Sequence, residues 1–198
     1  MLQYSDFSRD VQTEKKLPGS YEWWYFDAVS ENGYAVVVIF YDGNPFSRRY
    51  IEALESTGTD LNGQASGYPA ISISLYRDGR HIFYSFEEVS PDDADFSSGH
   101  PEVKIANNSL TGTKTGESLR YEVLLDQMLP NGDRLKGTLH FTSDAAETGL
   151  LSGFGRPSTV NHLREAHEWN LVQPKAKVSG SLHVTGYREE RVDFNGIG

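Results

Sequence analysis

The chain has 198 residues and a mass of 22.1 kDa, with a formal net charge of −10 and a sequence pI near 5.0. This acidity excludes nucleic acid as an expected partner, because a negative protein is repelled by the phosphate backbone and by anionic membrane surfaces. Cysteine is absent, which excludes disulfides, thiolate metal sites and a cysteine nucleophile.

The first residues, Met1 to Asp10, contain no apolar stretch of the kind that signal peptides carry. No part of the sequence approaches the roughly 18 consecutive apolar residues of a membrane-spanning helix. We therefore expect no stable membrane insertion and a cytoplasmic location for the chain as written. A periplasmic or membrane-peripheral location stays open, because a removed leader would leave the same sequence.

The most unusual segment is an aromatic run that begins at Tyr21 and places two of the three tryptophans side by side. Neighbouring side chains of a strand point to opposite faces. One face would carry Glu22, Trp24 and Phe26, and the other Tyr21, Trp23, Tyr25 and Asp27. Because both faces carry large rings, we expect this strand to lie between a packed core and either a second layer or a ligand cavity.

Further strands are predicted from apolar residues that recur every second position between turn residues. The predicted strands and hairpins lie at 34–41, 71–86, 121–125, 135–141, 178–185 and 191–197. Asp78-Gly79 lies between two alternating runs, which is the strongest short signal for a hairpin. We expect about ten strands with local connections, forming an all-β, antiparallel up-and-down barrel or a strongly curved sandwich.

Helical signals are weak, and only 145–148 and 162–168 have the composition for a short helical turn. The sequence contains no internal repeat and no linker that would divide the chain. We expect residues 1–198 to form one β domain.

Glu22 has two possible roles. Burial among aromatic rings raises the pKa of a carboxyl group, which is what a general acid needs at neutral pH. Alternatively, Glu22 accepts a hydrogen bond from a backbone amide or an indole N–H and closes one end of the barrel.

A second Glu-Trp pair occurs at His167-Glu168-Trp169, shortly after His162. If the last strands close the barrel against the first, both Glu-Trp pairs meet on one rim. The histidines and carboxylates would then form a polar cluster suited to proton transfer to an alkene. The alternative is that the two histidines are ordinary surface or satisfied core residues.

The sequence offers no frame for a metal or a cofactor. Acidic segments such as Asp92-Asp93-Ala94-Asp95 lack the spacing of a calcium loop, and no zinc-binding pair of histidines is present. The G-x-S-x-G element of serine hydrolases and the glycine-rich phosphate loops are also absent. We expect no metal and no cofactor.

The run Glu22-Trp-Trp-Tyr-Phe26 resembles a segment near the start of the carotenoid 1,2-hydratase (hydroxyneurosporene synthase) family and its AttH-like relatives. The segments 71–86, 103–110, 173–180 and 192–198 resemble the same family in the same order. The resemblance implies a lipocalin-like barrel, the first of two in the family. In the family the closing G-x-G continues into a polar Y-H-D-H-N-W-G motif and a second barrel, and this sequence ends at Gly198 before that motif.

The resemblance implies a domain that binds a hydrophobic small molecule, carotenoid-like or another isoprenoid, in an enzyme that adds water across an alkene. We predict Glu22 as the catalytic acid. Ligand contacts are predicted at Trp23, Trp24, Tyr25, Asp27, His167, Glu168 and Trp169. The alternatives are a non-catalytic carrier of a hydrophobic ligand and a relative of pericyclic, Diels-Alderase-like cyclases. A second barrel or a second copy of the chain is the expected protein partner.

Overall fold

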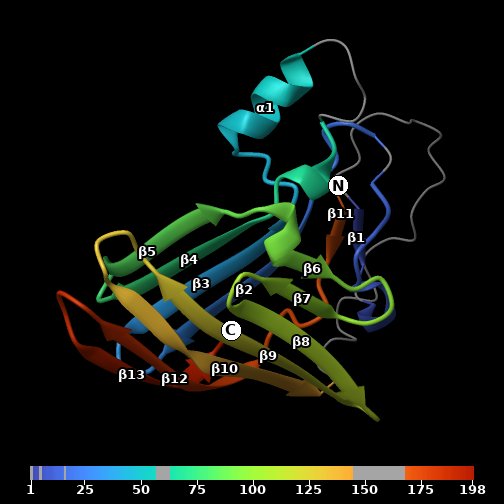
Figure 1. Ribbon diagram of the computed structural model, residues 1–198. Helices are drawn as coiled ribbons and strands as arrows, with labels where there is room; N and C mark the ends of the chain where they lie inside the picture. The colour runs from blue at the N-terminus through green and yellow to red at the C-terminus, as the bar shows by residue number, and fades with distance from the viewer. Residues whose placement is uncertain (1, 5, 16, 57–62, 145–167) are drawn as a thin grey trace.

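The computed structural model describes residues 2–4, 6–15, 17–56, 63–144 and 168–198. Almost all of them belong to β-strands or to the connections between strands (Figure 1). The predicted helical turn at 145–148 lies outside the described residues. The one predicted at 162–168 also lies outside them, except for Glu168, which is in a strand.

The described residues contain thirteen strands, one α-helix and three 3₁₀ turns. The strands are β1 Leu2–Tyr4, β2 Glu22–Ser30, β3 Tyr34–Asp42, β4 Ala70–Arg77, β5 Arg80–Glu88, β6 Ala94–Phe96, β7 Glu102–Ile105, β8 Asn108–Thr115, β9 Ser118–Met128, β10 Arg134–Asp144, β11 Glu168–Asn170, β12 Lys177–Thr185 and β13 Glu190–Ile197. The helix is α1 Arg48–Glu55, and the 3₁₀ turns are η1 Phe7–Arg9, η2 Ala65–Gly67 and η3 Pro91–Asp93.

Eleven strands form one antiparallel sheet in the order β5-β4-β3-β2-β13-β12-β10-β9-β8-β7-β6. The sheet curls into a half-barrel, so that the half with β2 to β5 lies across the half that contains β8, β9, β10, β12 and β13 (Figure 1). The predicted all-β, antiparallel, lipocalin-like architecture is confirmed. The short strands β1 and β11 form a separate pair, and they run parallel to each other.

The predicted hairpins follow the turn chemistry of the sequence. Asp78 and Gly79 both have positive φ, at 49° and 74°, which is the backbone of a tight two-residue hairpin turn between β4 and β5. Gly33 closes the β2–β3 turn with φ of 85° and donates its N–H to the carbonyl of Ser30. The sequence therefore predicted these two connections.

Helix α1 was not predicted. Ser47 caps its start by accepting a hydrogen bond from the N–H of Tyr50, and Tyr50 is its one buried residue. The Tyr50 hydroxyl donates to the carbonyl of Ser20, and the Tyr50 ring stacks on Tyr68. The helix has eight residues, about two turns, so its apolar side chains Tyr50, Ile51 and Leu54 do not repeat over enough turns for periodicity to identify it from the sequence.

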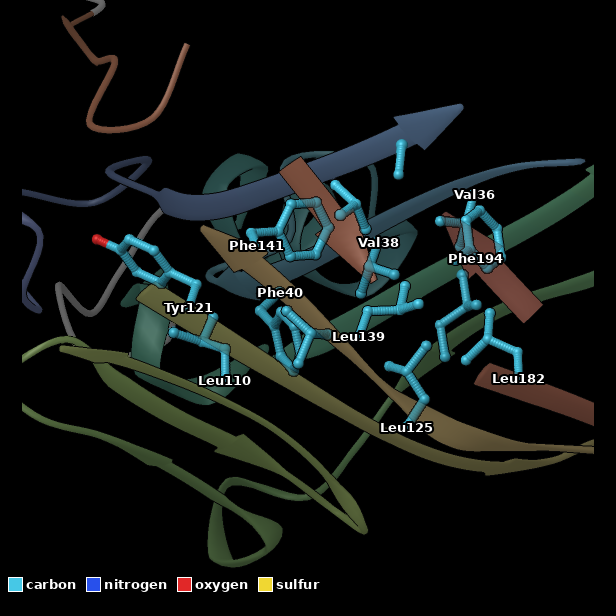
Figure 2. Close-up of a cluster of buried hydrophobic side chains, with 14 of the residues drawn as sticks. Val36, Val38, Phe40, Leu110, Tyr121, Leu125, Leu139, Phe141, Leu182 and Phe194 are labelled. Atoms are coloured by element: carbon cyan, nitrogen blue, oxygen red, sulfur yellow. The ribbon is translucent and has the colours of Figure 1, made fainter. Parts of the chain in front are cut away.

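The two halves of the curled sheet share one hydrophobic core. Figure 2 shows Val38 and Phe40 of β3 pointing toward Leu139 and Phe141 of β10 across the interior. Leu125 of β9 lies in the same cluster and is fully buried. The middle of the described interior is therefore filled by aliphatic and aromatic side chains.

The junction between the two halves is narrow. Strand β13 pairs with β2 through only two registered positions, Gly196 with Ser30 and Ile197 with Val29. The backbones approach so closely that a Cβ on Gly196 would lie 2.0 Å from the carbonyl oxygen of Val29. Residue 196 must therefore be glycine for this pairing to form.

We predict that Gly196→Ala lowers the free energy of unfolding by about 1–3 kcal/mol, because the added methyl group pushes β13 away from β2. Urea denaturation followed by circular dichroism measures this change. Gly67→Ala is the matched control, since no heavy atom lies within 4 Å of its added Cβ. An equal loss of stability in the two variants would show that the close approach at Gly196 is unimportant.

Candidate functional site

A cluster of charged residues lies at one end of the β2–β3 hairpin. Glu22 of β2 is directly opposite Asp42 of β3, so the two strands bring two carboxylates together. Like charges in this position repel each other. The Lys15 ammonium lies between them, with Nζ 2.9 Å from Oε2 of Glu22 and 2.5 Å from Oδ2 of Asp42.

This ion-paired cluster is largely shielded from water. The side chain of Lys15 is 8% exposed and that of Asp42 is 1% exposed. Gln12 adds a hydrogen bond from Nε2 to Oδ2 of Asp42, at 2.8 Å. Because a buried charge is costly without a partner, Lys15 and Gln12 fix the segment that carries them across the end of the hairpin. We refer to residues 10–15 as the N-terminal strap.

Glu22 makes further hydrogen bonds to the strap. Its Oε2 accepts from the backbone N–H of Thr13 at 3.0 Å, and its Oε1 accepts from the Thr13 hydroxyl at 3.3 Å. This contact with a backbone amide is the structural role considered for Glu22. Its role as a catalytic acid stays a prediction.

A second acid of the strap, Asp10, lies in a different environment. The hydroxyl of Tyr121 on β9 donates a hydrogen bond to Oδ2 of Asp10. Burial raises the pKa of Asp10 to about 6; the Tyr121 hydrogen bond opposes this shift and the negative charge of Glu22 adds to it. Burial and the neighbouring Asp10 also raise the pKa of Tyr121. Asp10 is therefore a carboxyl group that keeps its proton into the weakly acidic range.

Aromatic rings adjoin this pair. The Tyr121 ring makes an edge contact with Phe7 at a centroid distance of 6.0 Å and a tilted contact with Phe26 at 5.5 Å. The Phe26 ring also contacts the ring of Phe141, with centroids 5.2 Å apart, and this contact links the Asp10–Tyr121 pair to the core. Phe7 and Phe26 are only partly buried. Asp10 is thus linked through Tyr121 to partly buried aromatic rings at the edge of the core.

The predicted ligand-contacting residues of β2 divide between the two faces of the sheet. Trp24 points inward, is 6% exposed and stacks on Phe96. Tyr25 points outward and is 46% exposed, and Asp27 shares that outer face. Trp24 and Tyr25 therefore do not face one common cavity. Large rings on both faces of β2 were predicted, and the structure shows them.

The two Glu-Trp segments do come together. The rings of Trp23 and Trp169 make an edge contact on the outer side of β2, with centroids 6.2 Å apart. Glu168 belongs to β11, where its backbone pairs with Leu2. His167 and His162 lie outside the described residues, so the predicted histidine cluster remains a prediction.

Sequence reasoning missed Asp10. It lies directly after a 3₁₀ turn in an irregular segment, where no periodicity assigns a face to a side chain. Its environment is created by Tyr121, which is 111 positions away along the chain. No local signal in the sequence could have revealed this pairing.

Other types of site find less support in the described part of the chain. It contains no group of three or more histidine, aspartate or glutamate side chains placed to hold a metal ion. None of its helices is long and apolar enough to cross a membrane.

The raised pKa of Asp10 predicts a specific dependence of stability on pH. Between about pH 4 and pH 6 the folded protein keeps a proton on Asp10 that the unfolded chain releases. The stability contributed by this proton is complete at low pH and is lost as the pH rises through about 6. Asp10→Asn removes the ionisation but keeps an oxygen that accepts from Tyr121. We therefore expect Asp10→Asn to raise the melting temperature, relative to the parent protein, more at pH 8 than at pH 4.

Thermal denaturation at pH 4, 6 and 8 measures this difference. Glu117→Gln, at an exposed position in the β8–β9 turn, is the control for a change of net charge. The prediction is contradicted if the melting temperatures of Asp10→Asn and the parent protein differ by the same amount at all three pH values.

Comparison with known proteins places this geometry in context. No protein-family model matches the chain, and no solved structure matches it. The chain is 29% identical to a hydroxyneurosporene dehydrogenase of Chlorobaculum tepidum over 194 aligned residues. The aligned region covers 91% of this chain and 48% of that protein. The chain thus spans about half the length of this relative. The match supports, at modest identity, the carotenoid hydratase-like family that the Glu22-Trp-Trp-Tyr-Phe26 segment indicates.

Proposed function

We propose that this chain binds the end of an apolar, carotenoid-like isoprenoid and takes part in adding water across one of its alkenes, with Asp10 as the proton donor. The observation that carries the proposal is the buried Asp10 carboxyl, whose pKa is raised to about 6, and its hydrogen bond from Tyr121, whose ring contacts the partly buried rings of Phe7 and Phe26. The similarity to a hydroxyneurosporene dehydrogenase supports a carotenoid-related ligand.

The reaction needs one proton and one water molecule. Asp10 gives its proton to the less substituted carbon of the alkene, and the positive charge forms on the more substituted carbon. A water oxygen then bonds to that carbon and releases a proton, which returns to the Asp10 carboxylate. The sum is alkene plus water giving an alcohol, without an oxidant or a reductant.

The neighbouring rings suit this intermediate. The faces of Phe7 and Phe26 carry partial negative charge, which stabilises a carbocation without reacting with it. Tyr121 holds Oδ2 of Asp10 through its hydroxyl, so the other carboxyl oxygen is the one left to carry the proton. The pair thereby fixes the direction from which the proton is delivered.

Asp10 suits the role of acid better than Glu22. Glu22 faces the Lys15 ammonium at 2.9 Å and accepts two hydrogen bonds from Thr13, so both of its carboxyl oxygens are already bound by the strap. For Asp10, burial is the main influence and it raises the pKa to about 6. The function predicted for Glu22 is therefore better assigned to Asp10, with Glu22 as the residue that anchors the strap.

We predict that Asp10→Asn lowers hydration of an acyclic carotene by about 100-fold or more, the usual contribution of a positioned general acid. Glu22→Gln should retain most of the activity of molecules that remain folded. Turnover is measured on the complete natural protein as the gain of one water in the mass of the carotene. Circular dichroism establishes the folded fraction of each variant.

Binding is measured separately by quenching of tryptophan fluorescence with the same carotene. Under the proposal, Asp10→Asn binds the carotene as the parent protein does. Full turnover in Asp10→Asn together with loss of turnover in folded Glu22→Gln would return the acid role to Glu22. Binding with no turnover in the parent protein would identify a carrier instead of an enzyme.

A further inference from the structure

A serine, a histidine and a glutamate meet where β6 turns into β7. Oγ of Ser97 lies 3.1 Å from Nδ1 of His100, and Nε2 of His100 lies 2.5 Å from Oε2 of Glu102. A nucleophile, a base and a carboxylate that orients the base stand in the same order in the triad of serine hydrolases. Here the two ring nitrogens have exchanged places, so that Nδ1 faces the serine. None of these three side chains takes part in the proposed hydration.

The backbone fixes the shape of this loop. The N–H of Ser97 donates to the carbonyl of Glu102 at 3.0 Å, which closes the β6–β7 hairpin, and the carbonyl of Ser97 accepts from Gln12 of the strap at 2.9 Å. Pro101 is buried, and its carbonyl accepts from the N–H of Gly112 on β8 at 2.7 Å. The three side chains are therefore positioned by a backbone that is anchored on both sides.

The hydrogen bonds also determine which nitrogen of His100 carries the ring proton. An ionised glutamate only accepts, so the nitrogen that faces Glu102, Nε2, is the one that carries the hydrogen in neutral His100. Nδ1 then has a lone pair that faces Ser97. His100 is therefore arranged to accept the proton of the Ser97 hydroxyl.

The Ser97 oxygen accepts two further hydrogen bonds from the backbone. The N–H groups of Gly99 and His100 lie 3.2 Å and 3.3 Å from Oγ. Because these donors use the acceptor positions of Oγ, the hydroxyl hydrogen is directed toward Nδ1 of His100. The same donors stabilise the negative charge that develops on Oγ as the proton leaves.

The exposure of the group indicates which kind of substrate it takes. The side chains of His100 and Glu102 are 62% and 53% exposed, and Ser97 is half-buried, so a small molecule reaches Oγ from solvent. Interactions between exposed groups are weaker than the same interactions in a buried triad. The substrate must therefore bring a good leaving group of its own, as an activated ester does.

We propose that Ser97 is a nucleophile that takes an acyl group from a small activated ester and transfers it to water. Oγ bonds to the carbonyl carbon, its proton passes to Nδ1 of His100, and the departing alcohol takes that proton. Water then attacks the acyl group on Ser97 and gives a proton to Nδ1, which returns it to Oγ as the acid leaves. The sum is ester plus water giving acid plus alcohol. Glu102 is a positioning residue that holds the imidazole.

A fluorophosphonate probe tests the nucleophile, because the serine oxygen bonds to its phosphorus and fluoride leaves. The complete natural protein is treated with the probe, and mass spectrometry of its peptides locates the label. We expect the label on Ser97 in the parent protein and in Ser98→Ala, the matched control at the exposed next residue. Ser97→Ala and His100→Gln should take up no label in this loop, with circular dichroism to establish that both are folded.

Hydrolysis of p-nitrophenyl acetate measures the complete reaction as the rate above that of buffer. His100→Gln should lower this rate by about 100-fold, the usual contribution of a positioned base, and Ser97→Ala should remove it. Glu102→Gln should slow the reaction because the charge that holds the imidazole is lost. Glu102→Asp retains a carboxylate and should restore part of the lost rate, which a purely structural role of Glu102 would not require.

The proposal is overturned if the parent protein takes up no label or takes it up only at another residue. It is also overturned if folded Ser97→Ala hydrolyses the ester as fast as the parent protein, since the imidazole of His100 would then be the reacting group. Labelling of Ser97 without turnover of the ester contradicts the transfer to water. Labelling of Ser97, with turnover lost in Ser97→Ala and kept in Ser98→Ala, supports the proposal.

Discussion

The ammonium group of Lys15 is the interaction on which the functional end of this protein depends. Pairing of β2 with β3 places Glu22 opposite Asp42, and these two carboxylates need a cation between them. Lys15 supplies it from a segment with no regular secondary structure. The ion pairs therefore hold the strap across the end of the hairpin, and the position of Asp10 follows from that attachment.

The strap also connects the two halves of the sheet. Lys15 binds the β2–β3 hairpin, and Asp10 accepts a hydrogen bond from Tyr121 of β9 in the opposite half. A second polar bridge joins the halves elsewhere, where Gln127 of β9 donates to Glu87 of β5 at 2.5 Å. Because β2 and β13 share only two registered positions, these bridges and the common core hold the halves together. The environment of Asp10 is thus a property of the closed half-barrel.

The sequence predicted what local chemistry determines. Alternation and turn residues gave the β2–β3 and β4–β5 hairpins, and Asp78-Gly79 has the positive φ angles that such a turn requires. Helix α1 was not predicted because two turns are too short for its apolar side chains to establish a period. Asp10 and the Lys15 cluster were not predicted from the sequence for a different reason. Their partners are set by how a distant strand and an irregular segment meet, and no spacing in the sequence encodes that meeting.

Asp10 and the Lys15 cluster share one electrostatic element. The charge of Glu22 is among the causes that raise the pKa of Asp10, and Lys15 pairs with Glu22 as well as with Asp42. The same ion pairs that attach the strap to the β2–β3 hairpin therefore hold Glu22, the charge that adds to the raised pKa of Asp10.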